Sequence, residues 1–291
     1  MVLVGFTALR RKFFMADWLG LKDKVVVVTG AVGGMGTRFC EAFAEHGANV
    51  VLVDIKKDAI ETAAKALSEK YGVQTLPLAT DTTNEDEVDD AVKAVVAKFG
   101  RADILVNTAA ILRFAPFEDL RLDEWKTALN INLTGYFLMS QRFGRQMIAQ
   151  HHGTMVHIST VAAVFPETYS GAYSTTKAAV NMLSKQMAAE WGQFGIRSNC
   201  VMPCLVKTPM SADFYKDPKV LDGRERLVAS RRIGDLDDIT NAVLYLSSER
   251  SDYTNGGELR VDGGLGIMMQ DMIPKPGGRR EYAVKAHQAK K

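Results

Sequence analysis

Short apolar runs alternate with longer segments of helical periodicity along most of the chain, and this alternation limits the fold more than any other feature. The runs lie near 25–29, 50–54, 75–78, 104–107, 154–159, 197–202 and 258–261, and the helical segments near 35–47, 57–70, 84–99, 123–150, 174–194 and 235–247. The runs are nearly continuous in β-branched residues, as expected of strands that are covered on both faces. The pattern predicts an α/β fold: a doubly wound parallel sheet of about seven strands with helices on both faces.

Composition excludes several classes of protein. The chain has 291 residues and a formal net charge of +2, which gives no reason to expect a nucleic-acid partner. Its apolar runs are too short to span a membrane. The three cysteines, Cys40, Cys200 and Cys204, do not make a disulfide framework, and no neighbouring histidine or further cysteine completes a metal site. We therefore expect a cytoplasmic protein without a bound metal.

A single domain is expected over residues 15–266, because no repeat or low-complexity linker divides it. Residues 1–14 mix apolar and basic residues without an acid. They faintly resemble a targeting peptide but lack a small-residue cleavage site, so we interpret them as an extension. Residues 204–232 break the periodicity and predict a long excursion, of a kind that often covers a site. Residues 267–291 are a tail, expected to be peripheral or to reach a neighbouring subunit.

A glycine-rich turn follows the first apolar run. The segment 29–36 reads Thr-Gly-Ala-Val-Gly-Gly-Met-Gly and leads into a helical segment. Its backbone N–H groups can therefore approach a pyrophosphate at the helix N-terminus, and the missing Cβ atoms permit that approach. The spacing is T-G-x-x-x-G-x-G rather than G-x-G-x-x-G, and a plain glycine turn is the alternative. The candidate cofactor-binding residues here are Gly30, Gly34, Met35 and Gly36.

An acidic residue, Asp54, ends the second apolar run. A carboxylate there can accept hydrogen bonds from both hydroxyls of an adenosine ribose. Its charge would repel a 2′-phosphate by roughly 4 kcal/mol at about 4 Å and an effective dielectric near 20. We therefore expect NAD rather than NADP, with Asp54 and Ile55 as cofactor-binding residues. Lys56 and Lys57 could offset the repulsion, or could simply begin the next helix in solvent.

Polar and small residues end the third and fourth runs. Asp81 and Thr82 follow the third run and could meet the adenine, although Asp81 could equally serve as a turn residue. Asn107 ends the fourth run and Ala109 follows it closely. Small residues at this point would let a cofactor approach the backbone. We therefore include these four residues among the candidates for cofactor binding.

A tyrosine and a lysine, Tyr173 and Lys177, stand four residues apart in a helical segment. Such a spacing puts both side chains on one face, one turn apart. A nearby ammonium favours the phenolate and is expected to lower the tyrosine pKa from its usual value of about 10. The pair would then be a proton-transfer group usable near neutral pH.

Together these residues resemble the short-chain dehydrogenase/reductase family, in its single-domain branch. The resemblance covers about residues 20–265. It rests on Thr29–Gly36, Asp54, Asn107–Ala110, Asn132, Ser159-Thr160, Tyr173 with Lys177, Pro203–Thr208 and Val261–Gly264, in that order. It implies a Rossmann-type fold, an NAD(P)-dependent oxidoreductase acting on CH–OH groups, and a homotetramer or homodimer.

The family's roles follow residue by residue. Tyr173 would be the general acid/base, and Lys177 would bind the nicotinamide ribose and lower the Tyr173 pKa. Asn132 would hold a water that links Lys177 to solvent. Thr160 would hydrogen-bond the substrate oxygen. Val206 and Thr208 would meet the nicotinamide carboxamide.

Departures from the family pattern fall at the substrate end. Thr160 replaces the usual serine, and its methyl group stiffens the side chain. Ser159 is the alternative residue for hydrogen bonding the substrate oxygen, although strand alternation points its side chain to the opposite face. Cys204 stands where glycine usually follows the proline. The candidate substrate-lining residues are Arg113, Val161, Ala162, Glu167, Thr168, Cys204, Met210 and Phe214. Arg113 could capture an anionic group and Glu167 could bind sugar hydroxyls, or both could face solvent.

The sequence most resembles sugar- and polyol-oxidising members of the family, such as gluconate dehydrogenase-like enzymes. We therefore expect hydride transfer between NAD and an alcohol or carbonyl substrate, which would be a sugar, a polyol or a small hydroxy acid. The alternatives are an NADP-dependent carbonyl reductase of 3-oxoacyl type and a non-catalytic dinucleotide-binding sensor.

Overall fold

One parallel sheet of seven strands forms the centre of the protein. The computed structural model describes residues 18–274 together with 283, 285, 287 and 288. The strands are β1 (Val25–Thr29), β2 (Asn49–Asp54), β3 (Thr75–Ala79), β4 (Ile104–Asn107), β5 (Gly153–Ile158), β6 (Ile196–Pro203) and β7 (Glu258–Val261). Their order is β3-β2-β1-β4-β5-β6-β7, and all neighbours are parallel. The predicted sheet is confirmed, and every predicted run matches a strand to within one residue at each end.

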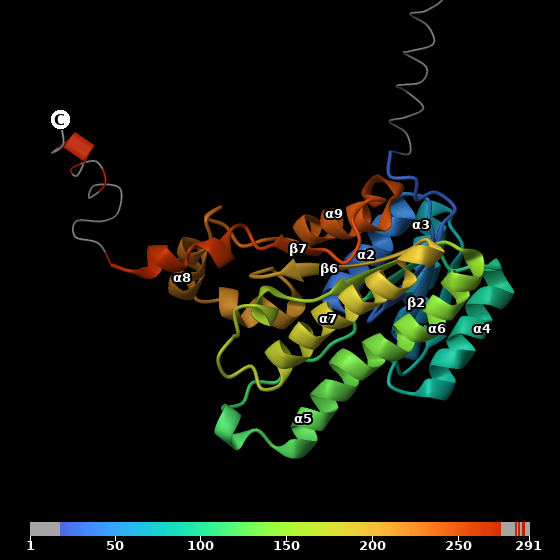
Figure 1. Ribbon diagram of the computed structural model, residues 1–291, viewed down its shortest axis with the longest axis horizontal. Helices are drawn as coiled ribbons and strands as arrows, with labels where there is room; N and C mark the ends of the chain where they lie inside the picture. The colour runs from blue at the N-terminus through green and yellow to red at the C-terminus, as the bar shows by residue number, and fades with distance from the viewer. Residues whose placement is uncertain (1–17, 275–282, 284, 286, 289–291) are drawn as a thin grey trace, which may run out of the picture.

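Helices connect the strands and cover the sheet in two layers (Figure 1). The α-helices are α2 (Gly34–Glu45), α3 (Lys57–Tyr71), α4 (Glu85–Phe99), α5 (Leu122–Leu129), α6 (Gly135–Gln150), α7 (Tyr173–Trp191), α8 (Pro218–Leu227) and α9 (Leu236–Ser247). A π-helical segment, η2 (Asn130–Thr134), joins α5 to α6, and short 3-10 turns are η1 (Phe117–Asp119), η3 (Val161–Ala163), η4 (Gly192–Phe194), η5 (Pro209–Tyr215), η6 (Glu249–Ser251), η7 (Leu265–Ile267) and η8 (Met269–Met272).

The valines of β1 explain why both faces must be covered. Successive strand residues point to opposite faces, and all five residues of β1 are buried. Val26 belongs to the core that contains Phe39 of α2 and Val243 of α9. Val27 belongs to the other core, with Phe143 of α6. Helices α2, α3 and α9 therefore cover one face, and α4, α6 and α7 cover the other.

The predicted helix over 123–150 is interrupted. It consists of α5 and α6 with the π-helical η2 between them. The apolar spacing hides this interruption, because a π-helical turn keeps the chain coiling in the same direction and inserts only about one extra residue. Such segments often occur at functional sites, and η2 contains Asn132.

The region 204–232 contains η5 and α8, so the predicted excursion is partly helical. Pro209 is the first residue of η5 and Pro218 is the first residue of α8. At this position the backbone N–H has no partner within the helix, so proline loses no hydrogen bond there. The side chains of Thr208 and Asp217 cap the two N-termini. This region directly follows β6, and α8 lies beyond the end of that strand in Figure 1.

The predicted N-terminal extension and C-terminal tail lie mostly outside the described residues. Residues 1–14 lie outside the described residues, as does most of the tail 267–291. The described part of the tail begins with the last residue of η7 and includes η8. Ile267 of η7 is 78% exposed and Met272 of η8 is 66% exposed. Among the described residues, no helix is both long and apolar enough to cross a membrane.

Candidate active site

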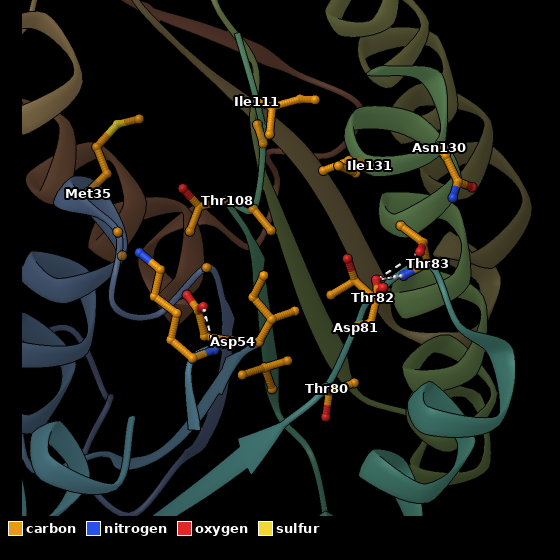
Figure 2. Close-up of a pocket in the computed structure, with 18 of the residues that line it drawn as sticks. Met35, Asp54, Thr80, Asp81, Thr82, Thr83, Thr108, Ile111, Asn130 and Ile131 are labelled. Atoms are coloured by element: carbon orange, nitrogen blue, oxygen red, sulfur yellow. Dashed lines mark hydrogen bonds between the residues drawn. The ribbon is translucent and has the colours of Figure 1, made fainter. Parts of the chain in front are cut away.

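A cleft of about 890 Å³ opens at the carboxyl ends of β1 to β4. This is the point where the sheet order reverses between β1 and β4, which is where ligands bind in open α/β sheets. Ten predicted cofactor-binding residues line it: Gly30, Gly34, Met35, Gly36, Asp54, Ile55, Asp81, Thr82, Ala109 and Thr208. Figure 2 shows Met35 and Asp54 on one side of the cleft, and Asn130 and Ile131 on the other.

The glycine turn fits an anionic group of a dinucleotide. No side chain caps the N-terminus of α2, and its first turn contains no acid. The first N–H groups of the helix therefore remain as donors, at the positive end of the helix dipole. Gly30 has φ +62°, and a Cβ atom on it would come 2.9 Å from the Ala109 Cα. A Cβ atom on Gly36 would overlap the Gly30 carbonyl oxygen. The turn can take this shape only with glycines at these positions.

Asp54 is fixed at the edge of the cleft by two backbone donors. Its Oδ1 accepts a hydrogen bond from Lys56 N at 3.2 Å, and its Oδ2 accepts one from Val32 N at 3.4 Å. Each oxygen keeps a further lone pair. The carboxylate can therefore accept hydrogen bonds from a ribose while it ties β2 to the glycine turn. Figure 2 shows the Asp54 side chain at the cleft.

Asp81 lines the cleft and also builds the turn that follows β3. Its side chain lies at the cleft (Figure 2). Its Oδ1 also accepts hydrogen bonds from Thr83 N at 2.9 Å and Thr83 Oγ1 at 2.8 Å. The turn after β3 is thus built by the same residue that faces the cleft.

Four predicted cofactor-binding residues, Asn107, Tyr173, Lys177 and Val206, are not among the residues that line the cleft. Asn107 is 1% exposed and donates to Ser140 Oγ at 3.0 Å, because the last residue of β4 points its side chain towards α6. Val206 is 6% exposed, and its carbonyl oxygen accepts hydrogen bonds from Ser211 and Tyr215. The structure does not bring the side chains of Asn107 and Val206 into the cleft.

The wall formed by α5 and η2 was missed. Lys126, Thr127, Asn130, Ile131 and Thr134 line the cleft. They lie far along the chain from the glycine turn, and the only local signal was the polar face of the helical segment 123–150.

Tyr173 and Lys177 lie one turn apart on α7, as predicted. Tyr173 begins the helix and is partly buried, whereas Lys177 is only 1% exposed. The Lys177 Nζ donates to the Ile158 carbonyl oxygen at 2.8 Å and to the Tyr136 hydroxyl at 2.9 Å. The lysine therefore reaches from α7 to β5 and α6.

The prediction that the pKa of Tyr173 is lowered is wrong. Burial raises the pKa of Tyr173 to about 12, and the charge of Glu167 adds to the rise. Burial also lowers the pKa of Lys177 to about 7. Both shifts have the same cause, since the low-dielectric interior disfavours either charge. The expectation from spacing considered the lysine's charge but not the burial of both groups.

Asn132 connects the start of α7 to the cleft. It is fully buried in η2, where its Oδ1 accepts from Ile111 N at 2.8 Å and its Nδ2 donates to Ile111 O at 2.9 Å. The same Nδ2 lies 3.3 Å from Thr176 Oγ1, which in turn donates to the Tyr173 carbonyl. Ile111 lines the cleft, so a short series of hydrogen bonds joins the cleft wall to the start of α7.

Thr160 and Ser159 point to opposite sides, as strand alternation predicts. The Ser159 hydroxyl is buried and donates to the Lys177 carbonyl at 3.2 Å. Thr160 follows the end of β5 and caps η3 by accepting from Ala162 N, and its hydroxyl donates to Pro203 O at 3.4 Å. Thr160 therefore contacts η3 and the end of β6, whereas Ser159 contacts α7.

Two of the predicted substrate-lining residues, Glu167 and Phe214, are a charged and an aromatic residue. Glu167 is exposed, and its negative charge raises the pKa of both Tyr173 and Cys204, so it lies near both. Phe214 of η5 meets Phe114 edge to face, with ring centroids 6.3 Å apart, and the Arg224 guanidinium lies 4.3 Å from the Phe214 centroid.

The other candidate substrate-lining residues differ in exposure. Arg113 and Thr168 are exposed, Ala162 is half-buried and Val161 is buried. The side chain of Met210 lies outside the described residues. Within the described residues, no three His, Cys, Asp or Glu side chains group as metal ligands.

The fold and the cleft define a Rossmann-type dinucleotide-dependent oxidoreductase with a tyrosine–lysine pair. A family model described as enoyl-(acyl carrier protein) reductase matches residues 30–266. The chain belongs to the short-chain dehydrogenase/reductase family, and it is an NAD(P)-dependent dehydrogenase that acts on CH–OH groups.

Relatives and solved structures cover most of the chain. D-threitol dehydrogenase from Mycolicibacterium smegmatis is 36% identical over 247 residues, which cover 85% of this chain and 94% of that protein. A structure of NAD+-bound xylitol dehydrogenase has a TM-score of 0.79 and 31% identity, over 84% of this chain and 99% of that one. A gluconate 5-dehydrogenase from Burkholderia cenocepacia, in complex with NADP and tartrate, has a TM-score of 0.83 and 31% identity, over 87% and 99% of the two chains.

Proposed function

We propose that the protein oxidises a polyol or sugar-derived alcohol to the corresponding carbonyl compound, with NAD as the hydride acceptor. The observation that carries the proposal is the Tyr173–Lys177 pair on α7 beside η3, which Thr160 caps. The relatives support the substrate class, because threitol, xylitol and gluconate each carry several hydroxyl groups.

In this mechanism the residues of the chain hold the substrate oxygen and move its proton. Tyr173 accepts the hydroxyl proton, while Thr160 hydrogen-bonds the same oxygen. Burial raises the pKa of Tyr173, and Lys177 in its protonated form opposes that rise by favouring the phenolate. Asn132 fixes the start of α7 against the cleft wall. NAD, when bound, supplies the hydride acceptor, and the protein supplies orientation and electrostatics.

Asp54 supports NAD over NADP. Its carboxylate lies at the end of β2 with lone pairs free for ribose hydroxyls, and its charge disfavours a phosphate there. The relatives include both an NAD+-bound and an NADP-bound enzyme. The preference of this protein for NAD or NADP is therefore inferred from its own residues.

A second candidate is an NADP-dependent carbonyl reductase, and Lys56 is the observation in its favour. Lys56 lines the same cleft as Asp54, and an ammonium near a 2′-phosphate would offset the repulsion. Measuring the dissociation constants of NAD and NADP by isothermal titration separates the two candidates. Tighter binding of NADP would support the reductase.

The substrate class is tested with a panel of alcohols followed by NADH absorbance. The panel contains threitol, xylitol, glycerol, gluconate and a 3-hydroxyacyl thioester. The proposal predicts turnover of at least one polyhydroxylated compound with NAD. Turnover of the thioester alone would reject it.

We also propose that the protein is a homotetramer or a homodimer built on α6 and α7. Phe137 of α6 and Met182 of α7 are 41% and 62% exposed, and packing of α6 and α7 against a second copy would bury both side chains. Light scattering on the wild type and on the Phe137→Lys/Met182→Lys double variant tests this. A smaller particle for the variant supports the interface, and a wild-type monomer excludes it.

A further inference from the structure

Three buried groups form a closed triangle of hydrogen bonds behind the catalytic tyrosine. The Lys177 Nζ donates to Tyr136 OH at 2.9 Å and to Ile158 O at 2.8 Å, and Tyr136 OH lies 3.1 Å from the same carbonyl oxygen. Lys177, Tyr136 and Ile158 are 1%, 2% and 3% exposed. Nothing in the sequence pattern predicted this role for Tyr136.

The donors and acceptors of the triangle can be assigned. A lysine ammonium has three N–H donors and no acceptor, so the Tyr136 oxygen must accept from Lys177. The tyrosine's single proton is then donated to Ile158 O. Two of the three lysine donors are used in this way, and one remains for a group outside the triangle.

Tyr136 is itself held firmly. It packs in a small buried cluster with Val180 and Cys200, and its ring centroid lies 6.1 Å from that of His157. Burial raises the pKa of Tyr136 well above its usual value, so the phenol stays neutral. Its hydroxyl is thus a fixed acceptor on a rigid aromatic side chain.

We propose that Tyr136 is a positioning residue for Lys177: its hydroxyl and the Ile158 carbonyl fix two of the ammonium donors, so that the third is directed towards the reacting groups. The proposal rests on the dehydrogenase function proposed above. It adds a residue of α6 to the groups on which the reaction depends.

The consequence for proton transfer follows from the loss of one acceptor. In Tyr136→Phe the buried ammonium keeps only the Ile158 carbonyl, so the charged form is less favoured and less fixed. Tyr173 then loses part of its cationic support. The acid limb of the alcohol oxidation rate is therefore expected to move to higher pH.

Four titratable groups lie around Lys177: Tyr173 on its own helix, Tyr136 on α6, His157 on β5 and Cys200 on β6. Of these, His157 and Cys200 do not produce the shift. Burial lowers the pKa of His157 to about 3 and raises that of Cys200 to about 12. Both stay neutral across the range of the assay.

The test compares Tyr136→Phe, Tyr136→Gln and Ser184→Ala. Ser184 is a matched control, because it is a buried hydroxyl on α7 that contacts Ser198 rather than Lys177. Phenylalanine keeps the ring that packs in the core, and glutamine restores an oxygen acceptor. The measurements are the melting temperature, kcat and KM across pH, and NAD binding followed by protein fluorescence across pH.

We expect Tyr136→Phe to lower kcat/KM roughly ten- to a hundredfold, as for a lost hydrogen bond to a charged group, and to move the acid limb to higher pH. Tyr136→Gln should recover part of the rate, and Ser184→Ala should keep the wild-type profile. An unchanged pH profile in Tyr136→Phe, or an equal shift in Ser184→Ala, overturns the proposal. Because NAD binding needs no substrate, an altered pH dependence of binding in Tyr136→Phe supports the proposal even if the wild type oxidises no polyol.

Discussion

The Lys177 ammonium lies 4.5 Å from the ring centroid of Tyr136 but 5.9 Å from that of Tyr173. The residue four positions before Lys177 in the sequence is therefore not its nearest aromatic neighbour. The lysine is anchored in the core on one side and faces the catalytic tyrosine on the other. The contacts to Tyr136 and Ile158 therefore fix where the ammonium lies relative to Tyr173.

Tyr173→Phe should abolish turnover and leave NAD binding intact. General acid–base catalysis contributes about 10²- to 10⁴-fold, so the expected loss is at least a hundredfold in kcat. NADH absorbance and isothermal titration measure the two effects. Tyr169→Phe is the matched control, since Tyr169 is 66% exposed and four residues away. Wild-type activity in Tyr173→Phe would reject the assignment.

Glu167→Gln should move the acid limb of alcohol oxidation to lower pH. The Glu167 charge raises the pKa of Tyr173 above the value that burial alone produces. Removing that charge lowers the pKa, so Tyr173 becomes deprotonated at a lower pH. The measurement is kcat/KM against pH. A shift in the opposite direction would mean that Glu167 acts through the substrate rather than on Tyr173.

Asp54→Ser should increase the use of NADP relative to NAD. The repulsion between a carboxylate and a phosphate about 4 Å apart is roughly 4 kcal/mol at an effective dielectric near 20, so the ratio of kcat/KM values should change by up to about a thousandfold. Lys56→Ala is the companion variant and should weaken NADP binding only. A ratio unchanged by Asp54→Ser would remove Asp54 as the selectivity residue.

Gly36→Ala should disrupt the glycine turn, because the new Cβ atom would overlap the Gly30 carbonyl oxygen. We expect NAD affinity to fall at least tenfold and the melting temperature to drop by several degrees. Gly223→Ala in α8 is the control, since a Cβ atom there meets nothing within 4 Å. That change should be neutral or stabilising by up to about 1 kcal/mol. Titration with NAD and thermal unfolding measure both variants.

Lys177→Met should be inactive but more stable than the wild type near neutral pH. Burial lowers the pKa of Lys177 from 10.5 to about 7. Between these values the unfolded chain binds a proton that the folded chain does not, so wild-type stability rises with pH there. The gain from methionine, on the order of a few kcal/mol, should be largest below pH 7 and fade towards pH 10.5. Denaturant unfolding at several pH values checks this, and a gain independent of pH would contradict it.

The strands were predictable because they are local patterns. Both faces of β1 are buried, so Val25–Val28 had to be continuous in apolar residues. The glycine turn and Asp54 were equally readable, because their function depends on short spacing after a strand. The sequence therefore predicted most of the side of the cleft that is formed by the glycine turn and Asp54.

The rest depends on contacts between distant residues. Lys177 meets Tyr136 across 41 positions of sequence, and no local pattern signals that meeting. The raised pKa of Tyr173 reflects burial by the whole fold, which a four-residue spacing does not show. The π-helical η2 was hidden because its spacing differs little from that of an α-helix.

The carbonyl of Val206 accepts hydrogen bonds from both Ser211 and Tyr215, so the chain after β6 folds back on its own starting point. Phe214 lies inside this folded-back segment, and the Arg224 guanidinium of α8 lies 4.3 Å from its ring centroid. Any displacement of α8 relative to η5 would therefore have to give up this cation–π contact.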